Sequence, residues 1–430
     1  MIYAVCGKPV LHSKSPLIFN NYFKSCGSSD VYTRIAAESG HEIISFLRSS
    51  GIAGCNVTAP FKDQVIPFLD RVDDEALRLQ SVNTIKNRNG VLTGFSTDSY
   101  GVYYTLLNCG KKYKDKRAVL LGAGGAARAA AVALDRLGLR VTVVNRTFEK
   151  AVSAANLCGG TAVTPDNAEE AIRKADVVIN TLLPEVDIIK SEWFKEDVLA
   201  LDAIYKESVF QQKAMKAGVR YVRGEEWLYY QADRAAEHFF GKRFGDIKPP
   251  ESFMEPVKIK TGTITLTGFM GSGKSSIAKN LAFCTEIPCY DMDEIIENSE
   301  GVSIADIFKT QGEEWFRQKE CELLEKLCEN NEKKIISCGG GVVTRKANRD
   351  ILRKKCLNIW IYADMDKSLE RVANTNRPLA SDGAEQFKAL FESRKELYAG
   401  CADMTIINSD KDVNQSVRRI NEEICEQIIC

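Results

Sequence analysis

A glycine-rich segment in the second half of the chain carries residue types that bind phosphate. Gly268-Phe-Met-Gly-Ser-Gly-Lys274-Ser275 has the spacing G-x-x-x-x-G-K-[ST], with a β-branched stretch before it and a helical stretch after it. In such a loop the backbone amides surround the phosphates, the lysine reaches the terminal phosphates and the hydroxyl binds Mg²⁺. The sequence therefore predicts a site for ATP and Mg²⁺. The expected contacts are Gly271, Ser272, Gly273, Lys274, Ser275 and Ser276.

Acids, arginines and glycines follow this loop at separate places. Asp293 ends the next strand-like segment, in the sequence Asp291-Met-Asp293, and a helix cap is its structural alternative. A run of glycines brings backbone amides against a ligand, whereas a plain turn rarely needs three of them. For any one arginine, a surface ion pair is the alternative. The glycines are Gly339, Gly340 and Gly341, and the arginines are Arg317, Arg371, Arg377 and Arg394.

A second glycine-rich turn lies nearer the start of the chain. Gly122-Ala-Gly124-Gly-Ala-Ala127 fits the spacing G-x-G-x-x-A, between a strand-like run and an alanine-rich helical stretch. Such a turn lets a dinucleotide pyrophosphate approach the backbone at a helix N-terminus. After the second strand, where an NAD site places an acid, this chain has an arginine with polar neighbours that suit a 2′-phosphate, which predicts NADP. The expected contacts are Gly122, Gly124, Gly125, Ala126, Ala127, Asn145, Arg146 and Thr147.

Four polar clusters also lie in the first hundred residues, and each on its own could be a capped turn. Together they offer hydroxyl and amide groups for a substrate with several hydroxyls. They also offer one lysine and one aspartate for proton transfer. Their candidate residues are Ser13, Ser15, Thr58, Lys62, Asn83 and Asp98.

Strands that alternate with helical stretches must position these residues. Buried runs at residues 117–121, 141–144 and 176–180 are separated by helical segments, as in a parallel sheet. Residues 1–98 show the same alternation in shorter pieces, and a new strand begins within residues 258–267. We expect an α/β protein. An N-terminal α/β substrate domain and a Rossmann domain for NADP would precede a P-loop kinase-like parallel α/β domain.

The chain has 430 residues, which is more than one hydrophobic core usually serves. Pro249, Pro250 and Pro256 lie close together and predict a semi-rigid linker. The expected segments are a substrate-binding and catalytic domain at 1–98, an NADP domain at 99–228, a helix returning to the substrate domain at 229–245, a linker at 246–257 and a phosphoryl-transfer domain at 258–430.

Composition excludes several classes of function. Lys plus Arg number 58, as do Asp plus Glu, so no bulk charge attracts nucleic acid or an anionic membrane. The 14 cysteines are scattered and the three histidines stand apart, which predicts neither a disulfide framework nor a zinc site. No signal-like start and no apolar run of membrane-spanning length is present. We expect a cytoplasmic protein that acts on small molecules, and the sequence leaves its oligomeric state open.

Residues 1 to about 245 resemble shikimate dehydrogenase, a family that reduces 3-dehydroshikimate to shikimate with NADPH. The resemblance implies that Ser13 and Ser15 hold the substrate carboxylate. It also implies that Lys62 and Asp98 form the catalytic dyad, in which Lys62 gives a proton to the carbonyl oxygen. Further implied substrate contacts are Thr58, Asn83, Tyr205 and Gln231, and Gly224 is implied on the nicotinamide side.

Three positions depart from the family pattern in this half. Ser96 stands where asparagine is usual, and Ala203 and Trp227 stand where methionine is frequent. We expect these changes to adjust affinity or cofactor packing without removing the dyad. The two serines favour shikimate over quinate, and quinate remains open as a side substrate.

Residues 258–430 resemble shikimate kinase. The resemblance implies that Asp293 accepts the proton of the acceptor hydroxyl and organises Mg²⁺ through water, beside the Mg²⁺ ligand Ser275. It places Arg371 against the adenine and Arg377 on a lid that closes over ATP and stabilises the transferred phosphoryl group. The implied shikimate contacts are Asp293, Arg317, Gly339, Gly340, Gly341 and Arg394. Two of the arginines suit a carboxylate, because a guanidinium pairs with it in two places.

Both resemblances belong to chorismate and aromatic amino acid biosynthesis, and the product of the first reaction is the substrate of the second. One alternative is a quinate/shikimate dehydrogenase joined to a kinase for another small hydroxy acid. The arginine pair and the Asp-Met-Asp sequence argue against it. The other alternative is a metabolite sensor that keeps both folds without the chemistry. The presence of Lys62, Asp98, Lys274 and Arg377 argues against a sensor.

Overall fold

The computed structural model describes residues 1–257, 262–330, 332–373, 383–408 and 412–428. It divides into two compact units. The first unit comprises Met1–Gln64, Asn87–Gly90 and Val257–Cys430, and the second comprises Val65–Lys86 and Val91–Pro256. The beginning of the chain and the segment expected to transfer phosphate thus belong to one compact unit. The domain boundaries expected from the sequence remain a prediction.

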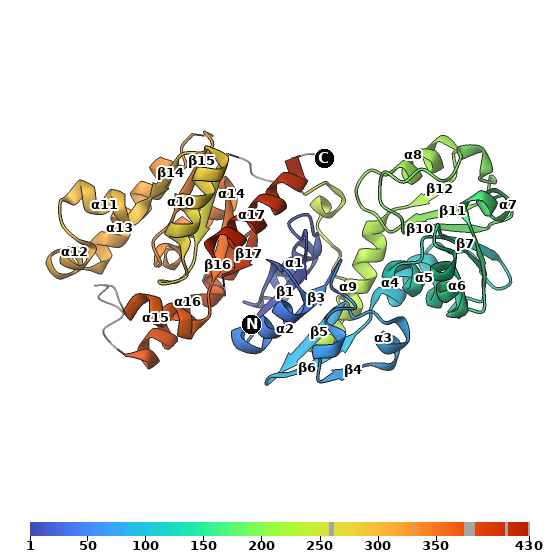
Figure 1. Cartoon of the computed structure of the whole chain (residues 1–430), viewed down its shortest axis with the longest axis horizontal. Coiled ribbons are helices and arrows are strands. Elements are labelled where there is room, and N and C mark those ends of the chain that lie inside the picture. Colours follow the sequence, from blue (N-terminus) through green and yellow to red (C-terminus); the bar gives the residue numbers. More distant parts are fainter. Residues whose placement is uncertain (258–261, 331, 374–382, 409–411, 429–430) are drawn as a thin grey trace. The chain divides into compact units, whose positions relative to one another are not determined.

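Parallel strands form the centre of the first unit (Figure 1). Each strand in this part of the sheet pairs in parallel with its neighbours. Every residue of β13 and β16 is buried, as expected for parallel strands covered by helices. In sheet order, the strands are β14 (Cys289–Asp291), β15 (Lys334–Ser337), β13 (Thr263–Thr267), β16 (Cys356–Tyr362), β17 (Met404–Ile407), β2 (Val31–Ala36), β1 (Ile2–Gly7) and β3 (Gly54–Val57).

Helices connect and cover these strands. Helix α10 packs against β15 and α17, and α14 packs against β16. The helices of the first unit are α1 (Ser15–Ser25), α2 (Gly40–Ser50), α10 (Lys274–Thr285), α11 (Met292–Glu300), α12 (Ile304–Thr310), α13 (Glu313–Leu327), α14 (Lys346–Lys355), α15 (Met365–Ala373), α16 (Ala384–Cys401) and α17 (Val413–Ile428), with a 3-10 turn η5 (Val342–Thr344).

The second unit contains a six-stranded parallel sheet. Numbered along the chain, its strands lie in the order 6-5-4-1-2-3, which is the order of a dinucleotide-binding Rossmann sheet read from the other edge. The α/β class expected from the sequence is confirmed. The strands are β12 (Arg220–Val222), β11 (Leu199–Asp202), β10 (Val177–Asn180), β7 (Arg117–Leu121), β8 (Arg140–Val144) and β9 (Thr161–Val163).

Two apolar clusters cover the two faces of this sheet, because successive strand residues point to opposite faces. Leu120 belongs to one cluster with residues of α4, α5 and α9, and Val119 belongs to the other with residues of α7 and α8. The helices are α3 (Asp74–Leu79), α4 (Asp98–Asn108), α5 (Gly125–Arg136), α6 (Phe148–Asn156), α7 (Ala168–Arg173), α8 (Val209–Lys216) and α9 (Gly224–Phe240).

Short elements complete the chain. Strand β4 pairs with β6 in parallel. The short strands are β4 (Arg71–Val72), β5 (Thr84–Arg88) and β6 (Val91–Phe95), and the 3-10 turns are η1 (Ile66–Phe68), η2 (Pro165–Asn167), η3 (Ser191–Trp193) and η4 (Glu251–Met254).

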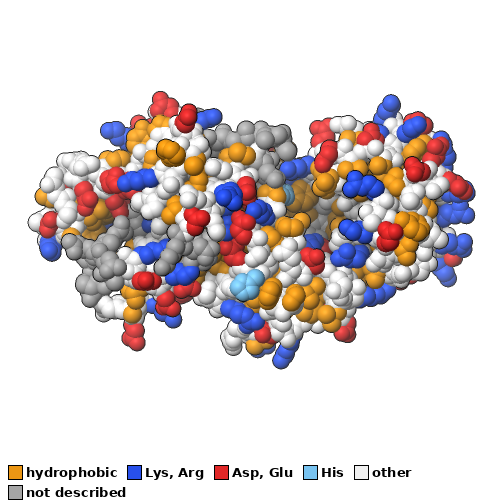
Figure 2. Space-filling view, in the orientation of Figure 1, with side chains coloured by type: hydrophobic (Ala, Val, Ile, Leu, Met, Phe, Trp, Pro, Cys, Tyr) orange, Lys and Arg blue, Asp and Glu red, His pale blue; other side chains and the backbone are white. Residues whose placement is uncertain are grey.

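The surface has no dominant charge on the face that Figure 2 shows, where basic and acidic side chains are interspersed. This agrees with the equal numbers of the two kinds of residue in the sequence. Within the described part of the chain, every helix is too short or too polar to cross a membrane. The same described residues contain no group of three or more His, Cys, Asp or Glu side chains arranged to hold a metal ion.

Candidate active sites

The phosphate loop connects strand β13 to helix α10. Its last glycine, Gly273, precedes the helix with a φ of 92°, a conformation that favours glycine. Two segments from much later in the chain hold the loop. Asn408, after β17, donates a hydrogen bond to the carbonyl oxygen of Ser272 at 2.7 Å, and Arg371 of α15 donates to that of Gly271 at 3.1 Å. Tertiary contacts therefore fix the loop in addition to its local sequence.

The polar groups of this loop fit a nucleotide phosphate with its Mg²⁺. Lys274 is largely buried, and its Nζ donates to the carbonyl oxygen of Phe269 at 3.0 Å. The Oγ of Ser275 lies 3.2 Å from the Oγ of Ser337, and Ser276 is exposed in the first turn of α10. The Oγ of Ser272 is buried and has no hydrogen-bond partner within the described residues. An ammonium group, hydroxyls and backbone amides are the groups that such a ligand needs.

Asp291, and not Asp293, caps helix α11. Its Oδ1 accepts hydrogen bonds from the backbone nitrogens of Asp293 at 3.0 Å and Glu294 at 3.4 Å. The alternative that Asp293 is the N-cap of the helix is therefore wrong, because Asp291 is the N-cap. The side chain of Asp293 lines a cavity beside the phosphate loop instead.

A buried ion pair stands behind the same cavity. The Nη1 of Arg317 donates to Oε2 of Glu320 at 2.9 Å, and its Nη2 donates to Glu313 at 3.0 Å. Burial raises the pKa of Glu320 to about 6, against the opposing effect of Arg317 and with a further rise from Asp293. Glu320 was not among the predicted site residues. An acid three positions after an arginine on one helix is the signal that could have identified it.

The run of three glycines leaves room for these charged side chains. A Cβ at Gly341 would lie 2.1 Å from the guanidinium carbon of Arg317, and a Cβ at Gly339 would lie 2.4 Å from Oε1 of Glu320. At Gly340 a Cβ would meet no heavy atom closer than 3.4 Å. The carbonyl oxygen of Gly340 accepts a hydrogen bond from Nη1 of Arg394 at 3.3 Å. At two of the three glycines, the buried ends of charged side chains therefore occupy the space that a Cβ would take.

One cavity of about 450 Å³ brings most of the predicted kinase residues together. Those that line it are Ser275, Asp293, Arg317, Gly339, Gly340, Gly341 and Arg394. Met270 of the phosphate loop and Asp291 of the Asp-Met-Asp sequence also line it, although neither was assigned a site role. Sequence reasoning missed the remaining lining residues, which are Glu294, Glu297, Ser303, Ile304, Ala305, Phe308 and Phe316. Arg377 lies outside the described residues.

The dinucleotide turn lies in the second unit, between β7 and α5. Gly122 has a φ of 106°, and a Cβ there would lie 2.4 Å from Oγ1 of Thr181. Gly124 caps α5 without any side-chain hydrogen bond, and a Cβ there would meet nothing within 4 Å. The helix N-terminus, where Gly125, Ala126 and Ala127 begin α5, is thus accessible to a pyrophosphate.

The segment after β8 carries the groups expected to select NADP. Arg146 and Thr147 are exposed, and Nδ2 of Asn145 donates to the carbonyl oxygen of Thr147 at 2.9 Å. An exposed guanidinium group beside a hydroxyl suits a 2′-phosphate. These side chains therefore fit the cofactor expected from the sequence.

Asp202 organises the turn that carries Tyr205. Its carboxylate is buried, and it accepts hydrogen bonds from Oγ of Ser208 at 2.6 Å and from the backbone nitrogen of Ile204 at 3.0 Å. Burial raises the pKa of Asp202, and these hydrogen bonds oppose that rise. A Cβ at Gly224 would lie 2.8 Å from the carbonyl oxygen of Ile204, so that α9 begins in close contact with the turn. Tyr205 itself is half-buried.

Asp98 is held by its neighbours at the first turn of α4. Nδ2 of Asn83 donates to its Oδ1 at 2.8 Å, and the backbone nitrogen of Thr97 donates to Oδ1 of Asn83 at 2.8 Å. Nε1 of Trp227 donates to the carbonyl oxygen of Asp98 at 3.0 Å. The departure at position 227 therefore adds support to this turn. Thr97 belongs to one of the four polar clusters but was not assigned a site role. Gln231 is half-buried on α9.

The remaining predicted dehydrogenase residues lie in the first unit. Ser13 and Ser15 are largely buried and their Oγ atoms are 3.4 Å apart, with Ser15 as the first residue of α1. Thr58 directly follows β3, and its backbone nitrogen donates to the carbonyl oxygen of Cys6 at 2.9 Å. Lys62 is half-buried next to the buried Phe61.

Family models match both ends of the chain. Residues 5–85 match the shikimate dehydrogenase substrate binding domain, and residues 106–203 match the shikimate / quinate 5-dehydrogenase family. Residues 270–425 match the shikimate kinase family. The matched segments contain the phosphate loop's Lys274, the dinucleotide turn and the serines near the start of the chain.

Curated relatives repeat this division. A shikimate dehydrogenase (NADP(+)) of Aquifex aeolicus is 35% identical over 241 residues, which cover 54% of this chain and 89% of the relative. A shikimate kinase of Dehalococcoides mccartyi is 41% identical over 167 residues, which cover 38% of this chain and 90% of the relative.

Solved structures agree for the dehydrogenase part. The crystal structure of the Aquifex aeolicus shikimate dehydrogenase has a TM-score of 0.54 at 33% identity, and covers 59% of this chain and 96% of that one. The Thermus thermophilus shikimate 5-dehydrogenase in complex with NADP(H) and shikimate has a TM-score of 0.52 at 31% identity, with 59% and 97% covered. Over its first part this chain belongs to the shikimate dehydrogenase family, and over its last part it belongs to the shikimate kinase family.

Proposed function

We propose that this chain is a bifunctional enzyme that reduces 3-dehydroshikimate to shikimate with NADPH and phosphorylates shikimate to shikimate 3-phosphate with ATP. The family matches at both ends support the pair of reactions. The observation that carries the proposal furthest is the 450 Å³ cavity, where the phosphate-loop residue Ser275 meets the carboxylate of Asp293 and the guanidinium groups of Arg317 and Arg394. A phosphoryl acceptor that bears both a hydroxyl and a carboxylate fits this combination.

In the kinase site, ATP with Mg²⁺ supplies the phosphoryl group, and Lys274 and Ser275 would hold its phosphates and metal. Arg317 and Arg394 orient the acceptor, because each guanidinium can bind a carboxylate through two nitrogens. Asp293 accepts the proton of the acceptor hydroxyl. Glu320 holds the guanidinium of Arg317 from behind, through the bond at 2.9 Å.

Two further arginines complete the proposed kinase site. Arg371 donates to the phosphate loop at Gly271 and is assigned to the adenine side of the nucleotide. Arg377 is assigned to the closing segment that excludes water and stabilises charge on the transferred group.

In the dehydrogenase site, NADPH supplies the hydride, and the dinucleotide turn with Arg146 would hold it. Ser13 and Ser15 bind the substrate carboxylate through their hydroxyl groups. Lys62 gives a proton to the carbonyl oxygen as it becomes a hydroxyl, and Asp98 belongs to the same proton-transfer dyad. The hydrogen bond that Asn83 donates holds the carboxylate of Asp98, and the one that Trp227 donates holds its backbone carbonyl. Thr58, Tyr205, Gln231 and Gly224 are assigned to the substrate and nicotinamide contacts.

The Lys62→Ala variant tests the dehydrogenase assignment. Oxidation of NADPH with 3-dehydroshikimate should be abolished, because no other proton donor is assigned to the carbonyl oxygen. Phosphorylation of added shikimate should remain at the wild-type rate. Lys174→Ala, at an exposed ion pair with Glu170, is the matched control and should keep both activities. Reduction of 3-dehydroshikimate at the wild-type rate in Lys62→Ala would contradict the role of Lys62 as the proton donor.

A further inference from the structure

Strands from the dehydrogenase part and the kinase part share one sheet within the first unit. Strand β17 pairs in parallel with β2, with Thr405 opposite Ile35 and Ile406 opposite Ala36. On this junction Tyr362 and Phe46 also meet edge to face, with ring centroids 4.8 Å apart. The two parts are therefore joined by backbone pairing and by apolar contact.

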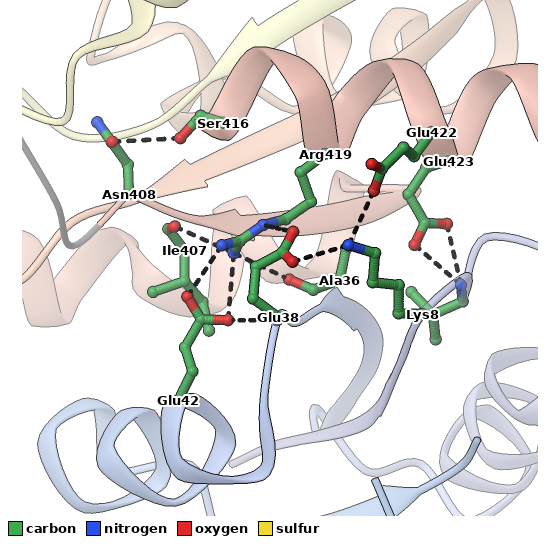
Figure 3. A network of polar contacts seen from close by, with 11 residues as sticks. Lys8, Ala36, Glu38, Glu42, Ile407, Asn408, Ser416, Arg419, Glu422 and Glu423 are labelled. Carbon is green, nitrogen blue, oxygen red and sulfur yellow. Dashed lines mark hydrogen bonds and ion pairs between the residues drawn. The ribbon is translucent and has the colours of Figure 1, made fainter. Parts of the chain in front are cut away.

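Arg419 of α17 is the central polar residue of this junction, as Figure 3 shows. Only 3% of its side chain is exposed, and it forms ion pairs with Glu38 at 3.0 Å and Glu42 at 3.1 Å. It also donates to the carbonyl oxygens of Ala36 and Ile407, one from each of the paired strands. A buried charge with this many partners fixes α17 against the dehydrogenase part.

One turn further along α17, Glu423 reaches the loop that precedes the two substrate serines (Figure 3). Its carboxylate accepts hydrogen bonds from the backbone nitrogen of Val10 at 3.0 and 2.9 Å and from that of Leu11 at 2.9 Å. The residue is 1% exposed. A carboxylate from the kinase part thus satisfies buried backbone donors of the dehydrogenase part.

The same loop is held at its other end by Arg34 of β2. Its Nε and Nη2 donate to the carbonyl oxygen of Ser13 at 3.0 and 2.7 Å, and its Nη1 donates to that of Asp403 in the kinase part at 3.1 Å. The backbone nitrogen of Ser13 donates to the carbonyl oxygen of Val10 at 2.9 Å. Because this turn joins Val10 to Ser13, a shift at Val10 is passed directly to the serines.

From these contacts we infer that Glu423, a residue of the kinase part, is a positioning residue for the substrate-carboxylate loop of the dehydrogenase. The inference rests on the proposed function, in which Ser13 and Ser15 bind the carboxylate of 3-dehydroshikimate. Glu423 does not touch the substrate. It acts through the backbone of Val10 and Leu11, which it keeps in place for the two hydroxyl groups.

Glu423→Gln in the full chain tests this role. The glutamine keeps the size of the side chain, but its amide oxygen carries no charge and its NH₂ group faces a backbone donor. The KM for 3-dehydroshikimate should rise roughly tenfold, which corresponds to about 1.4 kcal/mol. The dehydrogenase kcat should stay within about twofold, because the proton-transfer groups are unchanged and only carboxylate binding is weakened. The kinase KM and kcat for shikimate should not change.

Glu422→Gln is the matched control. Glu422 is the preceding residue on α17, and it forms a partly exposed ion pair with Lys8 at 2.9 Å, which leaves the backbone nitrogens of Val10 and Leu11 untouched. Pairs near the surface contribute little, so the KM for 3-dehydroshikimate should stay close to the wild-type value. Glu423→Asp, which keeps the charge with a shorter reach, should give a KM between those of the wild type and Glu423→Gln. This variant also serves if Glu423→Gln does not fold.

The KM values, the two activities and the unfolding temperature together distinguish a positioning role of Glu423 from a purely structural one. An unchanged KM for 3-dehydroshikimate in either Glu423 variant would overturn the inference. So would a parallel loss of both activities with a lower unfolding temperature, since that marks a residue needed only for folding. A wild-type chain without dehydrogenase activity would instead overturn the proposed function and the inference with it.

Discussion

The two glycine segments of this protein differ in what requires their glycines. In the phosphate loop, a Cβ at Gly271 would lie 2.4 Å from a backbone oxygen of α15, and one at Gly273 would lie 2.6 Å from the side chain of Asn408. In the dinucleotide turn, a Cβ at Gly122 would lie 2.4 Å from a threonine hydroxyl, but one at Gly124 would meet nothing. Contacts within the protein therefore disfavour a side chain at both Gly271 and Gly273 of the phosphate loop. In the dinucleotide turn they do so at Gly122 but not at Gly124.

This difference shows how the two loops are built. The phosphate loop is enclosed by its own protein and bonded to Arg371 and Asn408, so that its shape is fixed before a nucleotide binds. The dinucleotide turn is fixed at Gly122 but open at Gly124, where the helix N-terminus is left for the cofactor. Substitutions in the enclosed phosphate loop should therefore change the loop conformation and nucleotide binding together. In the open dinucleotide turn, a substitution can weaken cofactor binding without changing the conformation of the turn.

Among changes to the two glycine segments, the largest effect is expected from Lys274→Ala in the enclosed loop. Its buried ammonium group is assigned to the phosphates, and loss of one such group costs about a hundredfold to a thousandfold in rate. Phosphorylation of shikimate should fall by that amount, while NADPH oxidation with 3-dehydroshikimate stays normal. Lys346→Ala, at an exposed ion pair on α14, is the control for both assays. A kinase rate near that of the wild type in Lys274→Ala would contradict the assigned phosphate site.

The next largest effect is expected from Arg146→Ala, near the open dinucleotide turn, on the KM for NADPH. Because Arg146 is exposed, the change should leave folding intact and remove only a contact to the 2′-phosphate. A hydrogen bond to a charged group contributes about 1.5–3 kcal/mol, so the KM for NADPH should rise by about tenfold to a hundredfold. The KM for NADH should not change. Arg140→Ala, at the other end of β8, is the control, and equal changes for NADPH and NADH would refute the assignment.

A smaller effect, visible through pH, is expected at Glu320. The charged carboxylate holds Arg317, and its pKa is raised to about 6. As the pH falls through about 6, Glu320 becomes neutral and the KM for shikimate in the kinase reaction should rise, by up to about tenfold if one charged hydrogen bond is lost. In Glu320→Gln this pH step should be absent, and the same step in the variant would assign it to another group.

A fall in pH has opposite expected effects through Glu320 on folding stability and on shikimate binding. A pKa raised above the ordinary value of 4.5 means that the folded state holds the proton more tightly than the unfolded state. The stability from this group is therefore present below that value and is lost as the pH rises through about 6. Weaker shikimate binding at low pH thus does not arise from unfolding driven by Glu320, and unfolding temperatures measured at each pH would check this.

The smallest effect on activity is expected at Gly124. With a φ of −78° and open space around it, Gly124→Ala should leave the unfolding temperature unchanged and raise the KM for NADPH by a few-fold. Gly122→Ala should instead lower the unfolding temperature, because its φ of 106° costs a residue with a Cβ about 1–3 kcal/mol. Equal decreases in the unfolding temperature of Gly122→Ala and Gly124→Ala would contradict the difference described between a conformationally required glycine and an open one.

Local patterns predicted much of the architecture. The run at residues 176–180 is strand β10, Val177–Asn180, and the glycine motifs lie between β7 and α5 and between β13 and α10. These assignments succeeded because strand burial and glycine turns are encoded in short stretches of sequence. The kinase cavity also contains most of the residues that the family resemblance implied.

Long-range features were not predictable in the same way. The pairing of β17 with β2 joins residues at opposite ends of the chain, and no local pattern states which strand edges meet. The cap of α11 falls on Asp291 and not on Asp293, because the helix begins at Met292, and a boundary shifted by two residues cannot be read from two acids so close together. Phe308 lines the kinase cavity without any motif, since an apolar residue there has the same pattern as a core residue.

In the proposed function, one chain performs both reactions in sequence. The most direct measurement incubates the purified full chain with 3-dehydroshikimate, NADPH, ATP and Mg²⁺, and follows NADPH by absorbance and shikimate 3-phosphate by mass spectrometry. We predict that NADPH is consumed with or without ATP, and that shikimate 3-phosphate forms only when ATP is present. Loss of NADPH without formation of the phosphate would contradict the kinase assignment, and an absence of both changes would contradict the whole account.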